Sequence, residues 1–173
     1  MRRLFYRGIV ISSTITKPGH FIYGITAGEK EDVMEYVFDT KEKFTGFLDE
    51  LVRYCDELHV MDNEDIDTGF WDQMEPYMSE HCWSRRFPGH GRGENLRILK
   101  YPLDPEVADI LRKYDSFMDI GHDYEYDQGI DMAFYRNGEL VFWVLDHEDM
   151  CCLEKTAEPH FKDTILSLKI SRR

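Results

Sequence analysis

The sequence predicts an α+β fold in which an antiparallel β-sheet packs against two or three helices. Two segments, residues 40–58 and 104–118, have apolar side chains at the 3.6-residue spacing of a helix with one buried face. A third segment, residues 130–145, has the composition of two strands joined by Asn137-Gly138. That pair favours a type I′ hairpin turn because both positions need a positive φ. The length of 173 residues is that of one domain, which we expect to span residues 1–173.

The N-terminal part of the chain is typical of strands. Leu4–Thr16 is rich in β-branched and aromatic residues, and residues 17–20 contain the Pro-Gly pair of a turn. Together with Phe21–Thr26, these residues predict a first hairpin. Val33–Phe38 predicts a third strand.

The clearest helix of the chain comes next. Asp39 or Thr40 is its N-cap, and its apolar face consists of Phe44, Phe47, Leu48, Leu51, Cys55 and Leu58. Residues 62–80 are less regular. A helix in this segment would have an apolar face of Phe70, Trp71, Met74 and Met78. Pro76 would kink or end that helix.

A second helix is predicted in the C-terminal half. Residues 84–95 predict a loop and Leu96–Tyr101 a short strand. Asp104 is then a suitable N-cap and Pro105 a suitable first helical residue, ahead of an inward face of Val107, Ile110, Leu111, Tyr114 and Met118. The apolar spacing after residue 160 fits both a helix and a strand, and both remain open.

The formal net charge of −13 is concentrated in two stretches. Residues 29–80 hold 17 acidic and 4 basic side chains, and residues 104–163 hold 16 acidic and 5 basic. The remaining segments are basic. This excess is more than a small domain needs to stay in solution, so it indicates an acidic surface with a role in binding.

Composition argues against several functional classes. Hydrophobic residues make up 42 % of the chain and aromatic residues 14 %, far too many for a disordered acidic segment. The negative charge argues against binding nucleic acid, and no apolar run approaches the roughly 18 residues of a membrane span. The four cysteines form no CxxC pair and are expected to be free thiols of a cytoplasmic protein. No motif indicates a cofactor or a metal, so none is expected.

Two acidic segments form the candidate partner-binding surface. One precedes Trp71 and consists of Asp62, Glu64, Asp65 and Asp67. The other approaches the final hairpin and consists of Asp123, Tyr124, Glu125, Tyr126, Asp127 and Asp131. Carboxylates accelerate encounter with a basic partner, and tyrosines supply packing at a low cost in conformational entropy. The pattern predicts binding to a basic protein and leaves the oligomeric state open.

A second interpretation is a small enzyme or ligand-binding domain. It would use His147 and Glu148 with the glycine-rich basic loop of residues 85–97, whose glycines expose amide protons that could hold a phosphate. The Walker lysine and serine are missing from this loop. Within residues 146–149, only alternate members could converge on a metal, because neighbouring strand residues point to opposite faces. The simplest interpretation of His147 is a surface histidine at the end of an edge strand.

Three stretches in the last third of the chain resemble a known family. They are Leu111-Arg112-Lys113-Tyr114-Asp115-Ser116-Phe117, Gly129-Ile130-Asp131-Met132-Ala133-Phe134-Tyr135 and Asp146-His147-Glu148. They are similar to the C-terminal part of small bacterial immunity proteins, which neutralise polymorphic toxins, including those of contact-dependent growth inhibition. The resemblance implies a protein that binds a cognate, basic toxin domain such as a nuclease and occludes its active site. It implies no catalytic residue.

Overall fold

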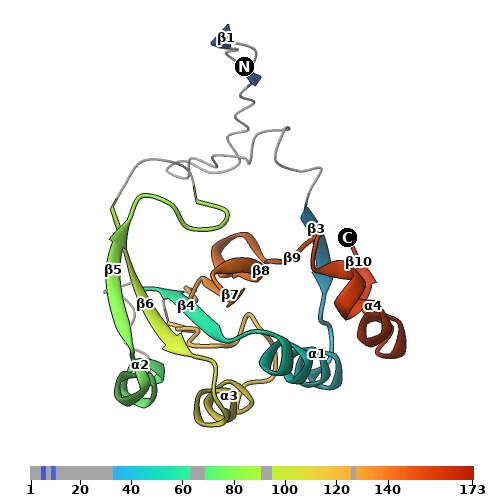
Figure 1. The fold of residues 1–173 in the computed structure, drawn as a ribbon, viewed down its shortest axis with the longest axis horizontal. Coiled ribbons are helices and arrows are strands. Elements are labelled where there is room, and N and C mark those ends of the chain that lie inside the picture. Colours follow the sequence, from blue (N-terminus) through green and yellow to red (C-terminus); the bar gives the residue numbers. More distant parts are fainter. Residues whose placement is uncertain (1–4, 7–8, 11–32, 63–68, 91–94, 126–127) are drawn as a thin grey trace.

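An antiparallel sheet of eight strands forms the centre of the structure. The computed structural model describes residues 5–6, 9–10, 33–62, 69–90, 95–125 and 128–173 (Figure 1). Within these ranges the strand order is β10-β3-β9-β8-β7-β4-β6-β5, and every neighbouring pair is antiparallel. The strands are β3 (Val33–Val37), β4 (Glu57–Met61), β5 (Glu80–Ser84), β6 (Leu96–Pro102), β7 (Met132–Arg136), β8 (Glu139–Leu145), β9 (Met150–Glu154) and β10 (Ser171–Arg172).

The described residues form four α-helices, which lie along one side of this sheet in Figure 1. They are α1 (Lys41–Tyr54), α2 (Phe70–Met74), α3 (Pro105–Leu111) and α4 (Glu158–Ser167), and two 3₁₀ turns are η1 (Glu75–Tyr77) and η2 (Asp146–Glu148). The predicted α+β class with an antiparallel sheet is therefore confirmed.

The expected N-terminal hairpin lies mostly outside the described residues. Two short strands, β1 (Phe5–Tyr6) and β2 (Ile9–Val10), pair with each other. They belong to the segment for which one continuous strand was predicted.

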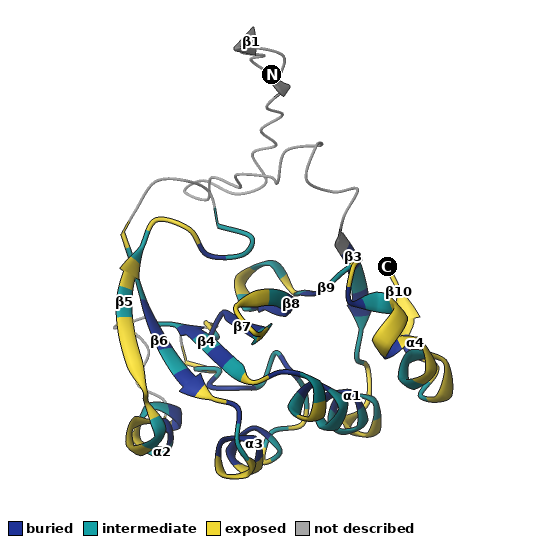
Figure 2. Ribbon diagram, viewed as in Figure 1, coloured by how far each residue is buried: buried dark blue, intermediate teal, exposed yellow. Residues whose placement is uncertain are grey.

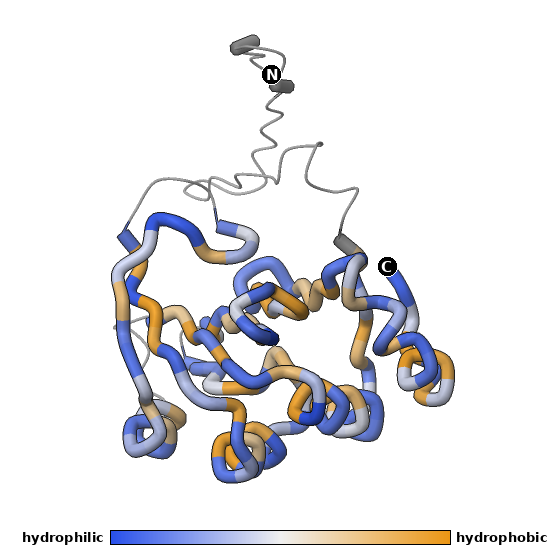
Figure 3. Tube along the Cα trace, viewed as in Figure 1, coloured by the Kyte–Doolittle hydropathy of each residue, from blue (hydrophilic) through white to orange (hydrophobic). Residues whose placement is uncertain are grey.

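The two predicted helix starts are confirmed, but both helices end earlier than the apolar spacing indicated. Thr40 caps α1 by accepting a hydrogen bond from the Lys43 amide, and Asp104 caps α3 in the same way. Leu58, assigned above to the face of the first helix, lies in β4 instead. Beyond Leu111 the chain turns, and Phe117 and Ile120 of this segment are buried in the core. Tyr114 and Met118 of the predicted face pack partly buried against it. Figure 3 shows the alternation of hydrophobic and hydrophilic residues around α1 and α3 that determines which face each helix buries.

The predicted hairpin lies at the centre of the sheet. Asn137 and Gly138 have φ angles of 50° and 79°, as the turn between β7 and β8 requires. The prediction that this hairpin ends in an edge strand is wrong, because β9 pairs with β8 on its other side. On the β7 side of the hairpin, the edge strand of the sheet is β5. This strand was not predicted, and it is largely exposed in Figure 2.

The ambiguous C-terminal tail contains both kinds of element. Residues 158–167 form α4, and the chain then turns into β10, which pairs with β3. The helix prediction is therefore confirmed up to Ser167. The residues of the strand pattern, Leu166, Leu168 and Ile170, lie in α4 and in the turn that follows it, and β10 begins only at Ser171.

The sheet buries apolar side chains on both faces. Alternate residues of β7 and β8 point to opposite sides: Phe134 and Phe142 join the large core beneath the helices, whereas Ala133 and Trp143 join a smaller cluster. Phe87, from the loop after β5, covers this smaller cluster. The loop is therefore attached to the face of the sheet that the helices leave uncovered.

The four cysteines are free thiols, and Cys151 and Cys152 are buried on the two faces of β9. Burial raises the pKa of the Cys152 thiol to about 12, so it is protonated at neutral pH. Within the ranges that the structure describes, no helix combines the length and apolarity that crossing a bilayer requires.

Phe117 is central to the large core, because its ring lies 4.9–6.4 Å from five other phenylalanine rings. Phe117→Ala should lower the free energy of unfolding by about 3–5 kcal/mol, through lost burial and the cavity left behind. Urea denaturation measures this change. The matched control Leu166→Ala removes a side chain that is 65 % exposed and should change stability by less than about 0.5 kcal/mol. Equal effects of the two variants would contradict this description of the core.

Candidate functional site

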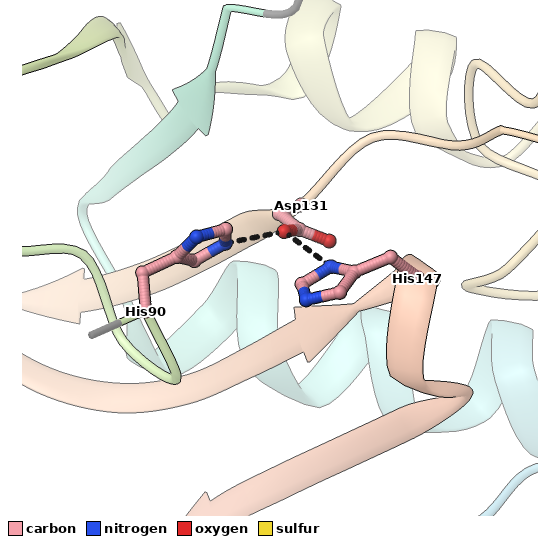
Figure 4. A group of neighbouring side chains, drawn as sticks. All are labelled: His90, Asp131 and His147. Atoms are coloured by element: carbon pink, nitrogen blue, oxygen red, sulfur yellow. Dashed lines mark hydrogen bonds and ion pairs between the residues drawn. The ribbon is translucent and has the colours of Figure 1, made fainter. Parts of the chain in front are cut away.

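Three side chains from distant parts of the sequence meet at one end of the central hairpin. His90 lies in the loop between β5 and β6, Asp131 directly precedes β7, and His147 lies in η2 after β8 (Figure 4). His90 Nε2 lies 2.6 Å from Asp131 Oδ2, and His147 Nδ1 lies 2.9 Å from the same oxygen. We refer to these three residues as the His–Asp–His cluster.

Hairpin register brings two members of the cluster together. Met132 pairs with Val144, so residue 131 and the residues that follow Leu145 leave the hairpin at the same end. The third member depends on a close approach of the preceding loop. Gly89 has a φ of +78°, and a Cβ atom there would lie 2.1 Å from a methyl carbon of Leu145. Glycine therefore lets the loop pack against β8 and places His90 beside Asp131.

Asp131 is buried, with 2 % of its surface exposed, and its two carboxylate oxygens accept hydrogen bonds from three groups. Its Oδ1 accepts a hydrogen bond of 2.7 Å from the amide of Asp146, while Oδ2 accepts from the two imidazoles. Burial alone would raise the pKa of Asp131. The hydrogen bonds from His147 and His90 outweigh burial, so the pKa lies below its usual value. The hydrogen bond between His147 and Asp131 also raises the pKa of His147 above its usual value.

A second buried carboxylate adjoins the cluster. The side chain of Asp146 is 7 % exposed, and its Oδ1 lies 3.4 Å from Nδ1 of His122. Burial raises the pKa of Asp146, opposite in direction to the shift of Asp131. The carboxyl group of Asp146 lies where a Cβ atom at Gly129 would be, with Cγ only 2.1 Å from that position. Gly129 is therefore required for this arrangement.

Chemically, the cluster combines one ionised carboxylate with two imidazoles, and their ligand atoms lie within 4.8 Å of one another. Such a set can bind a divalent metal ion, or it can exchange protons as a histidine held by a carboxylate. Half of the His147 side chain is exposed, so the cluster is accessible from solvent.

The second acidic segment begins in an ordered loop, residues 119–125, which we call the acidic loop. Asp123 and Gln128 exchange backbone hydrogen bonds of 2.7 and 3.2 Å, and the Asp123 carboxylate accepts from the Glu125 amide. Tyr124 is 76 % exposed, and its hydroxyl donates to Asp119 at 2.9 Å. The loop therefore presents an aromatic ring and carboxylates in a fixed arrangement.

The other predicted binding residues have different environments. Asp131 was expected on the acidic surface, and that prediction is wrong because its carboxylate is buried against two histidines. Asp62 is paired with Arg97 at 2.8 Å, and its side chain is 11 % exposed. Trp71 packs partly buried against Phe70 in the large core. The remaining predicted residues, Glu64, Asp65, Asp67, Tyr126 and Asp127, lie outside the described residues.

The glycine-rich basic loop contributes a histidine to the site. His90 lies within the loop of residues 85–97 that was predicted above to hold a phosphate, whereas the structure pairs this histidine with Asp131. Residues 91–94 of this loop lie outside the described residues. Glu148 is partly buried next to His147.

Comparisons with family models, with curated proteins and with solved structures found no match. The function is therefore inferred from the residues and geometry described above.

Gly129 offers a direct test of the site geometry. Gly129→Ala should displace the Asp146 carboxylate and destabilise the protein by about 1–3 kcal/mol, because the added methyl group overlaps a buried group. Chemical denaturation and the NMR signals of His122 measure the two effects. Gly69→Ala is the control, since nothing lies within 4 Å of its added Cβ. If Gly129→Ala is as stable as Gly69→Ala, with unchanged His122 signals, the close packing described here is wrong.

Proposed function

We propose that this chain is an acidic cytoplasmic immunity protein that binds a cognate basic toxin domain and occludes its active site. The observation that carries the proposal is the acidic loop, which holds the exposed ring of Tyr124 among carboxylates in a hydrogen-bonded arrangement. A prearranged loop loses little conformational entropy on binding, so more of the contact energy contributes to affinity.

Charge supports the same proposal. With a net charge of −13, the protein attracts a cationic partner over several ångströms, and the acidic loop would then fit a cleft that normally binds a polyanion. The described residues include no helix suited to a membrane, and all four cysteines are free. Free cysteines fit a reducing compartment such as the cytoplasm. The resemblance of residues 111–117 and 129–135 to immunity proteins names the class of partner.

One observation favours a second candidate function, a ligand-binding domain or small enzyme. His147 and His90 of the glycine-rich loop both contact Asp131. The histidine and the loop that this second function would use are therefore close together. A substrate would bind at the half-exposed ring of His147.

Partner capture from the host of origin tests the leading proposal. The full-length chain, immobilised at low salt, should retain a basic protein that carries a toxin domain, and adding the chain to that toxin should suppress its activity at equimolar ratio. Failure to retain any basic protein, or a captured toxin that stays fully active, would contradict the proposal.

Charge reversal in the acidic loop should slow association with the captured toxin. The double variant Asp123→Lys/Glu125→Lys is expected to lower the association rate about tenfold or more at low salt, because steering acts on encounter. Stopped-flow or surface-binding kinetics at two salt concentrations measure this rate. The control Glu139→Lys/Asp163→Lys makes the same change in net charge at exposed positions of β8 and α4. If both double variants slow association equally, total charge matters and the acidic loop does not.

A further inference from the structure

The His–Asp–His cluster has the composition of a metal site. Among the described residues, His90, Asp131 and His147 can each direct one ligand atom to a common point, with all three atoms within 4.8 Å of one another. We propose that these three side chains bind one divalent transition-metal ion, with Zn²⁺ as the preferred ion. This inference is independent of the proposed function, which rests on the acidic loop.

The ligand types select the class of ion. Two imidazole nitrogens and one carboxylate oxygen suit Zn²⁺ and its first-row neighbours, whereas Mg²⁺ and Ca²⁺ prefer oxygen ligands throughout. Three protein ligands leave one position of a tetrahedral ion open to water or to a group from a partner.

The observed distances require only a small expansion. His90 Nε2 and His147 Nδ1 lie 2.6 and 2.9 Å from Asp131 Oδ2. Ligands of a tetrahedral Zn²⁺ are separated by about 3.3 Å, given metal–ligand bonds of about 2.0–2.1 Å. Each imidazole nitrogen therefore needs to move away from Oδ2 by less than about 1 Å. The two nitrogens lie within 4.8 Å of each other and need to reach the same separation of about 3.3 Å. His147 can make most of this movement, because its side chain is 51 % exposed and lies on a short 3₁₀ turn.

Asp131 is already oriented as a ligand. Its Oδ1 is fixed by the amide of Asp146 at 2.7 Å, which leaves Oδ2 directed toward both imidazoles. Hydrogen bonds of this kind around a metal ligand hold it in place and commonly change metal affinity 10–100-fold. The buried carboxyl group of Asp146 lies beside the site, since the amide of the same residue donates to Asp131.

A zinc titration of the full-length protein, prepared without a polyhistidine tag and stripped with chelator, tests the site. Competition with a chromophoric chelator should show one Zn²⁺ per chain, and Zn²⁺ should raise the thermal midpoint. Co²⁺ should give the intense visible absorption of a tetrahedral site. His147→Gln and His90→Gln should each weaken binding by about 100-fold or more, since each loses one of three ligands.

His160→Gln is the matched control. His160 is also partly exposed and pairs with a carboxylate, Glu50, at 3.0 Å, but it is not part of the cluster. It should bind Zn²⁺ like the unaltered protein. The half-exposed position of His147 makes its variant suitable even if the variant of the less exposed His90 fails to fold.

Two results would overturn the proposal. One is the absence of stoichiometric Zn²⁺ binding to the unaltered protein, which would mean that the cluster has only a structural role through its hydrogen bonds. The other is a folded His147→Gln variant that binds Zn²⁺ as tightly as the His160→Gln control. Neither result bears on toxin capture, so the failure of this inference is distinguishable from failure of the proposed function.

Discussion

The buried carboxylate of Asp131 holds together three segments that are far apart in the sequence. An ionised carboxylate inside a protein costs several kcal/mol unless charged or polar groups surround it. Here His90, His147 and the amide of Asp146 surround it, and they come from the loop after β5 and from the turn after β8. The positions of that loop and of η2 therefore depend on satisfying one carboxylate at the start of β7.

The cluster and the acidic loop are neighbours. His122 of the acidic loop lies 4.7 Å from the ring of Tyr124 and contacts Asp146 at 3.4 Å. The amide of Asp146 in turn donates to Asp131 of the cluster. The cluster lies at the end of the central hairpin, whose Phe134 and Phe142 pack into the large core. The rigid sheet thus presents a candidate metal site and a candidate protein-binding loop side by side. An ion bound to His147 would alter the charge next to that loop.

The fold was predictable where local chemistry decides it. Helix caps at Thr40 and Asp104 and the Asn137-Gly138 turn depend on a few adjacent residues, and all are confirmed. Strands β5 and β9 were missed, because polar and cysteine-rich segments lack a clear alternation and gain their strand conformation from pairing. Strand β4 was missed because Leu58 also fits the apolar spacing of the preceding helix. Hairpin register alone could have placed Asp131 near His147. The role of His90 could not be predicted, because it depends on the packing of Gly89 against Leu145.

A double-mutant cycle on unfolding, measured in chelator, tests most directly whether Asp131 organises this end of the sheet. Asp131→Asn and His90→Gln should be non-additive, with a coupling free energy of about 1–3 kcal/mol, because each substitution removes the same buried contact. The pair His90→Gln and Asp163→Asn should be additive within about 0.5 kcal/mol, since exposed Asp163 lies on α4 outside the cluster. Additivity of Asp131→Asn with His90→Gln would contradict the central role of the buried carboxylate.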